Sequence, residues 1–179
     1  MRIVLGPERP ADHAAIRAVL LAAFTDQPIV AELVELIRAS PEFVPELALV
    51  ARVDGAVAGF VMLSHAELAS DSGERHRVLT LSPLAVAPAL QGRGIGSALV
   101  PAGLRAAEQL GEQLVVLEGS PRYYLRFGFR DCREFGIQMP LPDWAPPEAA
   151  MAFPLPAYDA RLRGRLVYPA AFVTTGTGH

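Results

Sequence analysis

The spacing of hydrophobic residues predicts a chain that mixes strands and helices. Apolar side chains recur every three or four positions in some segments, as in helices, and fill short runs bounded by Gly or Pro in others, as in strands. The expected strands are residues 3–5, 47–53, 56–63, 78–86, 114–118, a stretch within 129–137, and 149–153. The expected helices are residues 11–24, 29–37, 97–110 and 121–127. This order indicates a mixed sheet with helices packed on it.

Three local features refine this pattern. Asp54-Gly55 separates two expected strands, and both residue types tolerate a positive φ, so we expect a tight hairpin turn. Pro101 falls inside the expected helix 97–110, where it removes a backbone hydrogen bond and should kink the axis. Six prolines lie within residues 140–156, which predicts a loop around the strand at 149–153.

Composition narrows the class of protein. The chain has 179 residues, 51% of them hydrophobic and 20% charged, which predicts one folded domain and excludes a disordered chain. The net charge of −3 argues against a nucleic-acid partner. The single cysteine, Cys132, excludes an internal disulfide and a multi-cysteine zinc site, and the four histidines have no metal-ligand spacing, so we expect no metal. No apolar run is long enough to span a membrane, and we expect a cytoplasmic protein.

A Gly-rich segment, Gln91-Gly-Arg-Gly-Ile-Gly96, lies between an expected strand and an expected helix. The first turn of a helix presents free N–H groups and a partial positive charge, and glycines let a ligand approach the backbone, so the segment predicts a phosphate or pyrophosphate site. The chain contains no lysine, which excludes a Walker loop. Ser97 and Leu99 stand where a dinucleotide-binding G-x-G-x-x-G would need glycine. A purely structural strand–helix turn is the alternative.

Two motifs resemble those of the GNAT superfamily of N-acyltransferases. The Gly-rich segment fits that family's Q/R-x-x-G-x-G/A pyrophosphate loop, and residues 84–88 match the strand end "LAVxP" before it. Downstream, Tyr124-Leu-Arg-Phe-Gly-Phe129 fits the family's Y-x-x-x-G-F. The longer run of residues 119–129 is similar to a bacterial subgroup of predicted N-acetyltransferases with G-x-P-x-Y-Y-x-R-F-G-F. Two motifs in the family's order and spacing are more specific than either alone.

The resemblance implies the GNAT acyl-CoA N-acyltransferase fold, a mixed α/β structure whose mostly antiparallel sheet is flanked by helices. It implies one GNAT domain over residues 1–179, with the motif-supported core in 1–137 and a Pro-rich extension in 138–179. It also implies an N-acetyltransferase that moves an acetyl group from acetyl-CoA to a primary amine by direct attack in a ternary complex. The acceptor is then a small-molecule or peptide amine. A non-catalytic acyl-CoA-binding sensor or interaction module is the alternative, and a homodimer stays open.

The same resemblance assigns roles to residues. Acetyl-CoA would lie where the strands that end at Val86 and Glu118 splay apart. The Val86 backbone N–H would polarise the thioester carbonyl, and Tyr124 would give a proton to the leaving thiolate. The residues implied to bind acetyl-CoA are Leu84, Ala85, Val86, Gln91, Gly92, Arg93, Gly94, Ile95, Gly96, Ser97 and Tyr124.

The general base is left open by the sequence. Glu118, His65 and Glu67 end expected strands and are the candidates, with a water chain as a further alternative. Arginine is the only permanent cation of this chain besides its amino terminus, and the arginines expected to meet the phosphates of CoA are Arg93, Arg122, Arg126 and Arg130. Cys132 has no activating neighbour in the sequence and is expected to be a small buried residue.

Overall fold

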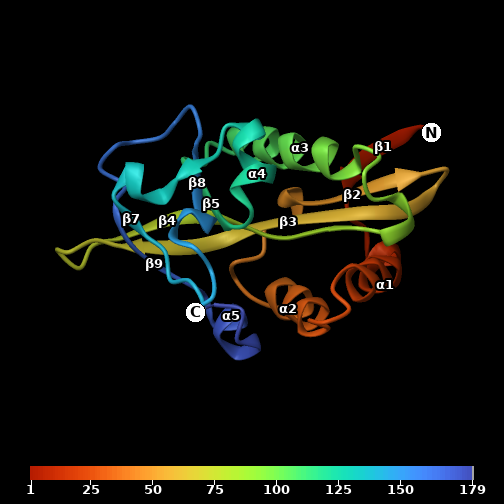
Figure 1. Ribbon diagram of the computed structural model, residues 1–179, viewed down its shortest axis with the longest axis horizontal. Coiled ribbons are helices and arrows are strands. Elements are labelled where there is room, and N and C mark those ends of the chain that lie inside the picture. Colours follow the sequence, from red (N-terminus) through yellow and green to blue (C-terminus); the bar gives the residue numbers. More distant parts are fainter. Residues whose placement is uncertain (179) are drawn as a thin grey trace. The chain divides into compact units, whose positions relative to one another are not determined.

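The computed structural model describes residues 1–178, and the chain divides into two compact units. The first unit comprises Met1–Ser64 and Ser82–Ala106, and the second comprises His65–Leu81 and Ala107–His179. Three long elements begin in one unit and end in the other: β3 (Ala56–Ala69), β4 (Arg75–Val86) and α3 (Ile95–Gln109). Figure 1 labels the elements along the chain.

The first unit contains a meander of antiparallel strands. β1 (Ile3–Pro7) pairs with β2 (Ala48–Val53), and β2 pairs with β3. The predicted hairpin at Asp54-Gly55 is confirmed, because both residues have positive φ, 51° and 85°, and Val53 lies opposite Ala56. Between β1 and β2 the chain forms α1 (His13–Ala23) and α2 (Ile29–Arg38), close to the predicted ranges.

Helices cover both faces of β3 in the first unit. The Arg38 guanidinium of α2 lies 5.8 Å from the centre of the Phe60 ring, on one face. On the other face α3 approaches closely, since a Cβ on Gly59 would lie 2.8 Å from the Ile95 side chain. Figure 1 shows the same arrangement, with α1 and α2 on one side of β3 and the start of α3 on the other. The helix continues across Pro101 to Gln109, so this proline does not end it.

The second unit contains a mixed sheet that is mostly antiparallel. β5 (Leu114–Glu118), exactly at its predicted residues, pairs in parallel with β4 at Leu79↔Val115 and Thr80↔Val116. Its other edge pairs antiparallel with β8 (Ala150–Pro154), which in turn pairs with β6 (Arg130–Asp131). The remaining elements of this unit are α4 (Pro121–Tyr124), β7 (Ile137–Gln138), β9 (Gly164–Val167) and α5 (Ala170–Thr175).

A hydrophobic cluster lies on one face of this second sheet. The cluster includes Leu114 and Val116, which are alternate residues of β5, and the fully buried Cys132. Tyr168 packs against this cluster. Because β9 pairs with both β7 and the last residues of β3, the C-terminal segment is part of this unit and not an appendage. In the described residues 1–178, no helix is long and apolar enough to cross a membrane.

The strand expected within 129–137 is present only as short pieces. The structure has the two-residue strands β6 and β7 there, separated by a 3-10 turn over Cys132–Phe135. The Asp131 carboxylate accepts a hydrogen bond of 2.8 Å from the Arg133 N–H and begins this turn, and Gly136 ends it in the left-handed region at φ 67°. β9 and α5 were not expected from the sequence, and β3 and β4 are longer at their shared loop than predicted.

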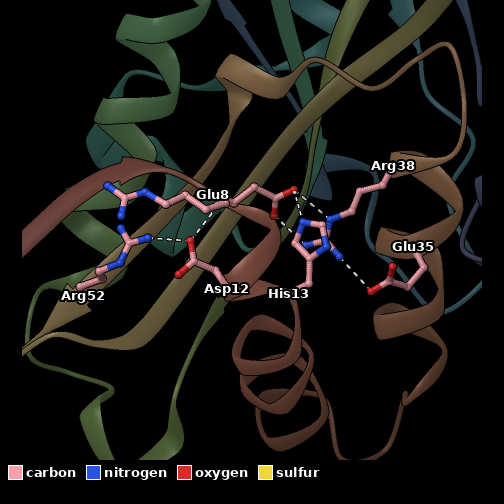
Figure 2. Close-up of polar contacts among 7 residues, drawn as sticks. Glu8, Asp12, His13, Glu35, Arg38 and Arg52 are labelled. Atoms are coloured by element: carbon pink, nitrogen blue, oxygen red, sulfur yellow. Dashed lines mark hydrogen bonds and ion pairs between the residues drawn. The ribbon is translucent and has the colours of Figure 1, made fainter.

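A buried ion pair ties the end of β1 to α2 (Figure 2). The Arg38 side chain is 8% exposed and that of Glu8 is 5% exposed. Arg38 donates from Nε to Glu8 Oε1 at 2.9 Å and from Nη2 to Oε2 at 2.6 Å, a bidentate geometry. Its remaining nitrogen Nη1 donates to Glu35 at 2.8 Å, and His13 Nε2 lies 3.5 Å from Glu8. These hydrogen bonds and ion pairs replace the contacts with water that Glu8 and Arg38 lose when folding buries them.

Breaking this pair should destabilise the protein. Arg38→Met leaves the Glu8 carboxylate buried without its main partner, so we expect the free energy of unfolding to fall by about 3 kcal/mol in urea titrations. Adding Glu8→Leu removes the orphaned charge and should recover most of that loss. Arg161→Met breaks an ion pair whose arginine is 90% exposed and should leave stability unchanged. A loss below about 1 kcal/mol for Arg38→Met would contradict the assignment.

Candidate functional site

The Gly-rich segment forms the link between β4 and α3 in the first unit. β4 ends at Val86, a 3-10 turn covers Pro88–Leu90, and α3 begins at Ile95. The Gln91 side chain folds back over this link and donates from Nε2 to the Val86 carbonyl at 3.1 Å. The first residue of the motif thus fastens the loop to the strand end.

The loop backbone needs glycine for conformation and is open to solvent. Gly92 and Gly94 have φ of 73° and 85°, and no atom lies within 4 Å of the Cβ that either position would carry. Residues 91–94, Arg93 included, are exposed. The Ala98 N–H donates to the Gly94 carbonyl at 3.0 Å and α3 begins at Ile95, so residues 95–97 form the first turn of the helix. An anionic group can approach this backbone closely.

Gly59 holds the helix N-terminus against the sheet. A Cβ on Gly59 would lie 2.8 Å from Ile95, 3.1 Å from Leu99 and 3.2 Å from the Ala85 carbonyl. Ile95 and Leu99 are fully buried and come from the first two turns of α3. Because only glycine fits between them and β4, this residue sets how near the loop lies to the Leu84–Val86 strand end.

Tyr124 lies in the second unit, at the end of α4. Its ring meets Tyr123 and Phe129 edge to face, with centroids 4.9 and 5.6 Å apart. A Cβ on Gly119 would lie 2.5 Å from the Tyr124 ring, and Gly119 is not in the left-handed region, so glycine is needed here for space alone. The ring position therefore depends on the residue that follows β5.

Burial keeps the Tyr124 hydroxyl protonated. It raises the pKa of this phenol well above 10.0, and the neighbouring Tyr123 raises it further. The raised value means that the proton stays on the oxygen throughout the neutral range and is available for donation. Tyr123 itself stacks under the Arg126 guanidinium at 4.1 Å, which also lies 4.8 Å from the Phe127 ring.

The three candidate bases all lie in the second unit, in different surroundings. His65 Nε2 lies 2.8 Å from Glu112 Oε1, with both side chains mostly buried. Glu67 accepts a hydrogen bond of 2.6 Å from Arg75 at the surface. Glu118 follows Leu114 and Val116 on one face of β5, beside Tyr168, whose pKa burial raises most and the charge of Glu118 raises further.

The arginines expected to meet phosphate also lie in different surroundings. Arg93 and Arg122 are exposed. Arg126 is held on the aromatic rings, while Arg130 lies 3.5 Å from Glu134 and 4.6 Å from the Phe135 ring centre. Among residues 1–178, no three His, Cys, Asp or Glu side chains gather into a possible metal site.

Comparison with known proteins decides the family. The model of the Acetyltransferase (GNAT) family matches residues 15–129, more than half of the chain. The chain belongs to the GNAT family. It is 36% identical to the uncharacterized N-acetyltransferase YjhQ of Escherichia coli K12 over 101 residues, 55% of this chain and 54% of YjhQ. It is 35% identical to the uncharacterized N-acetyltransferase YhbS of the same strain over 123 residues, 68% of this chain and 70% of YhbS. The matched segment thus spans about half the length of YjhQ.

Solved structures of GNAT proteins share the whole fold. The crystal structure of the GNAT family N-acetyltransferase YhbS from Escherichia coli in complex with CoA has a TM-score of 0.85 and 29% identity, covering 97% of this chain and 93% of that one. A GNAT family acetyltransferase from Brucella melitensis in complex with acetyl-CoA has a TM-score of 0.77 and 30% identity, covering 96% and 98%. The predicted fold class is confirmed, a mixed α/β structure with a mostly antiparallel sheet and flanking helices.

Two residues of interest in this GNAT chain were missed from the sequence. Gly119 stands at the first position of the G-x-P-x-Y-Y run, and that position was the available signal for its contact with Tyr124. Tyr168 lies in the C-terminal extension, where no family motif applies. Nothing in its local sequence indicates that it lies beside Glu118. The strand that precedes it, β9, has only four residues and gives a weak sequence signal.

The thiol of Cys132 should be unreactive in the folded protein. It is fully buried, and burial, with a smaller effect of Asp131, raises its pKa to about 12 from an ordinary 9.0. At pH 8 the thiolate fraction is then about one in ten thousand, against about one in ten for an ordinary thiol. We expect a disulfide reagent such as Ellman's to label the native protein only after unfolding. Rapid labelling under native conditions would contradict this placement.

Proposed function

We propose that this GNAT protein is an acetyl-CoA-dependent N-acetyltransferase that acts on a primary amine by direct attack. The observation that carries the proposal is the loop of residues 91–97, whose residues 91–94 are exposed and whose Gly92 and Gly94 have positive φ, at the N-terminus of a fifteen-residue helix. GNAT proteins with the same fold are known in complex with CoA and with acetyl-CoA, which supports this choice of cosubstrate.

The residues of the loop fit a pyrophosphate. The open space over Gly92 and Gly94 admits a phosphate to the backbone, and the N–H groups of the first helical turn point outward from the helix end. We assign Gln91, Gly92, Arg93, Gly94, Ile95, Gly96 and Ser97 to this contact, and the strand end Leu84, Ala85 and Val86 to the pantetheine arm. Arg93 and Arg122 are exposed and supply guanidinium groups for phosphate.

Two groups would act on the thioester of acetyl-CoA. Acetyl-CoA supplies an activated acyl group as its thioester. The Val86 N–H donates to the carbonyl oxygen as negative charge develops on it, a contribution typically of a few kcal/mol. Tyr124 donates its proton to the sulfur as the carbon–sulfur bond breaks, and its raised pKa keeps that proton in place beforehand.

Glu118 is the base that we favour. The amine must lose a proton before its nitrogen can attack, and a carboxylate can accept it. Glu118 ends β5 next to Gly119, whose missing side chain gives room to Tyr124. We assign the proton acceptance to Glu118.

The remaining assignments follow from the family. We propose one GNAT domain over residues 1–179, a cytoplasmic location, no metal, and a small-molecule or peptide amine as acceptor. A homodimer is compatible with these assignments. Direct attack within a ternary complex needs no covalent intermediate on the enzyme, so Cys132 has no role in it.

The loop assignment predicts that Gly94→Ala weakens acetyl-CoA binding. A Cβ at φ 85° costs about 1 kcal/mol and occupies the space proposed for the pyrophosphate, so we expect at least a roughly tenfold rise in Kd by isothermal titration calorimetry. Gly55→Ala is the matched control, with φ also 85° and also nothing within 4 Å. Equal losses in the two variants, or none in Gly94→Ala, would refute the assignment.

The proton-donor assignment predicts that Tyr124→Phe lowers kcat roughly a hundredfold while Kd for acetyl-CoA changes less than about threefold. The measurement is thiol release with a panel of amino acids, polyamines and lysine peptides. In the wild type, the raised pKa of Tyr124 keeps the donor protonated as pH rises, so kcat should show no alkaline fall from this group between pH 8 and 10.

Two further outcomes bear on this assignment. Gly119→Ala should act in the same direction as Tyr124→Phe, because its Cβ displaces the Tyr124 ring, whereas Gly6→Ala adds a Cβ into open space and serves as the control. A wild-type protein that binds acetyl-CoA yet releases no CoA with any amine would favour a non-catalytic acyl-CoA-binding module.

A further inference from the structure

A cavity of about 300 Å³ opens in the second unit where β4 begins. β4 and β5 pair in parallel at Leu79↔Val115, and β5 begins one residue earlier, at Leu114. Residues 75–77 of β4 therefore have no β5 residue beside them. They line the cavity together with residues 110–113, which follow α3. The cavity thus lies where the two parallel strands have not yet met, and its volume is that of a site for a small molecule.

Basic side chains dominate the lining of this cavity. Three consecutive residues of β4 contribute to it, Arg75, His76 and Arg77. Residues 110–113 contribute one charged side chain, Glu112, and the amide of Gln113. Because a guanidinium stays protonated throughout the physiological range, the lining carries two permanent positive charges against one carboxylate.

Two acidic groups near these basic residues are held by other partners. Glu112 Oε1 lies 2.8 Å from His65 Nε2, and both side chains are mostly buried. Asp159, whose pKa the charge of His76 helps to lower, accepts hydrogen bonds of 3.1 and 2.6 Å from Nε and Nη2 of Arg161. Neither carboxylate therefore pairs with an arginine of β4.

The three basic residues differ in how far their charges are compensated. Arg75 Nη1 donates to Glu67 at 2.6 Å in a half-exposed pair, and His76 Nε2 lies 3.6 Å from Glu74. For Arg77, the structure of residues 1–178 gives no hydrogen bond or ion pair. Arg77 is thus the cation of this cavity that is left without a counter-charge, and an anion from solution can supply one.

The end of α3 that borders the cavity is capped. A helix C-terminus carries partial negative charge on its free carbonyls, which would repel an anion. Here the Gly111 N–H donates to the Glu108 carbonyl at 2.9 Å, and the Glu112 N–H donates to the Ala107 carbonyl at 3.1 Å. Gly111 has a φ of 74°, as a Schellman cap requires. Two carbonyls of the last turn are therefore already bonded.

We propose that this cavity binds a small phosphomonoester through Arg77, Arg75 and His76. The three terminal oxygens of a phosphate can accept from two guanidinium groups and an imidazole together, whereas a carboxylate offers two oxygens. Arg75 can take part because its bond to Glu67 uses one of its five N–H donors. The ester group then occupies the rest of the cavity beside Gln113. This site shares no residue with those assigned to acetyl-CoA.

The imidazole of His76 reports on this cavity directly. The chain has four histidines, so proton–nitrogen spectra of the imidazoles are simple, and His76→Gln assigns the signal. At constant ionic strength, we expect glycerol phosphate to shift the His76 signal along a saturable curve. Its Kd should be lower than that of inorganic phosphate, which leaves most of the cavity unfilled, and lower than that of glycerate, which lacks a phosphate. An unshifted His76 signal, or equal Kd values for the three compounds, would overturn the proposal.

Charge variants test the assignment in both directions. Arg77→Gln should raise the Kd for glycerol phosphate at least roughly tenfold, as for lost hydrogen bonds to a charged group. Arg17→Gln removes the same charge from an exposed position of α1 and should leave the Kd unchanged. Glu112→Gln removes the carboxylate from the lining and should lower the Kd roughly threefold. Glu108→Gln, exposed on α3, changes the net charge equally and should not.

Thermal unfolding separates binding from folding. Arg77 is exposed, so Arg77→Gln and Arg17→Gln should unfold at the wild-type temperature. Equal rises in Kd for these two variants would show that only net charge matters, and would overturn the proposal. A higher Kd for Glu112→Gln would do the same. These measurements follow the cavity alone, so a protein that fails to bind acetyl-CoA or to acetylate an amine would contradict the proposed function and leave this inference standing.

Discussion

The close approach of α3 to the sheet is the constraint on which the loop of the first unit depends. Gly59 has no side chain to separate β3 from Ile95 and Leu99, and the Ala85 carbonyl lies just beyond. Gly103 of α3 allows a second close approach two turns after Ile95, because a Cβ at this position would lie 2.8 Å from Leu63. With the helix seated this closely, its N-terminus begins directly after the strand end, and the short link between them has to use left-handed glycines.

In the second unit, Gly119 also allows a close approach because it has no side chain. Gly119 follows β5, has an ordinary backbone conformation, and gives up only its side-chain volume to the Tyr124 ring. Glycines in this chain therefore serve two separable purposes. Those at 92 and 94 supply positive φ with open space above them, whereas those at 59, 103 and 119 supply space for packing. A substitution to alanine acts through backbone strain in the first group and through displaced neighbours in the second.

Sequence reasoning reached the elements whose signals are local. β5 occurs at its predicted residues, and the Asp54-Gly55 turn has the positive φ that its residue types indicate. It was less successful in 129–137, where the side chain of Asp131 and the left-handed Gly136 form a turn between two very short strands. The loop of residues 91–97 was recognisable because its chemistry is contiguous in sequence. The surroundings of Tyr168 were not, since Glu118 and Cys132, whose charges act on its pKa, come from separate segments.

The alternation of side chains along β5 bears on the two proton transfers of the proposed reaction. A proton must leave the amine nitrogen, and another must reach the sulfur, at different times and places along the reaction. Strand alternation predicts Glu118 on the face of Leu114 and Val116, while the absence of a side chain at Gly119 leaves room for the Tyr124 ring. Burial supports the donor role, because the raised pKa of Tyr124 prevents it from losing its proton before the thiolate forms.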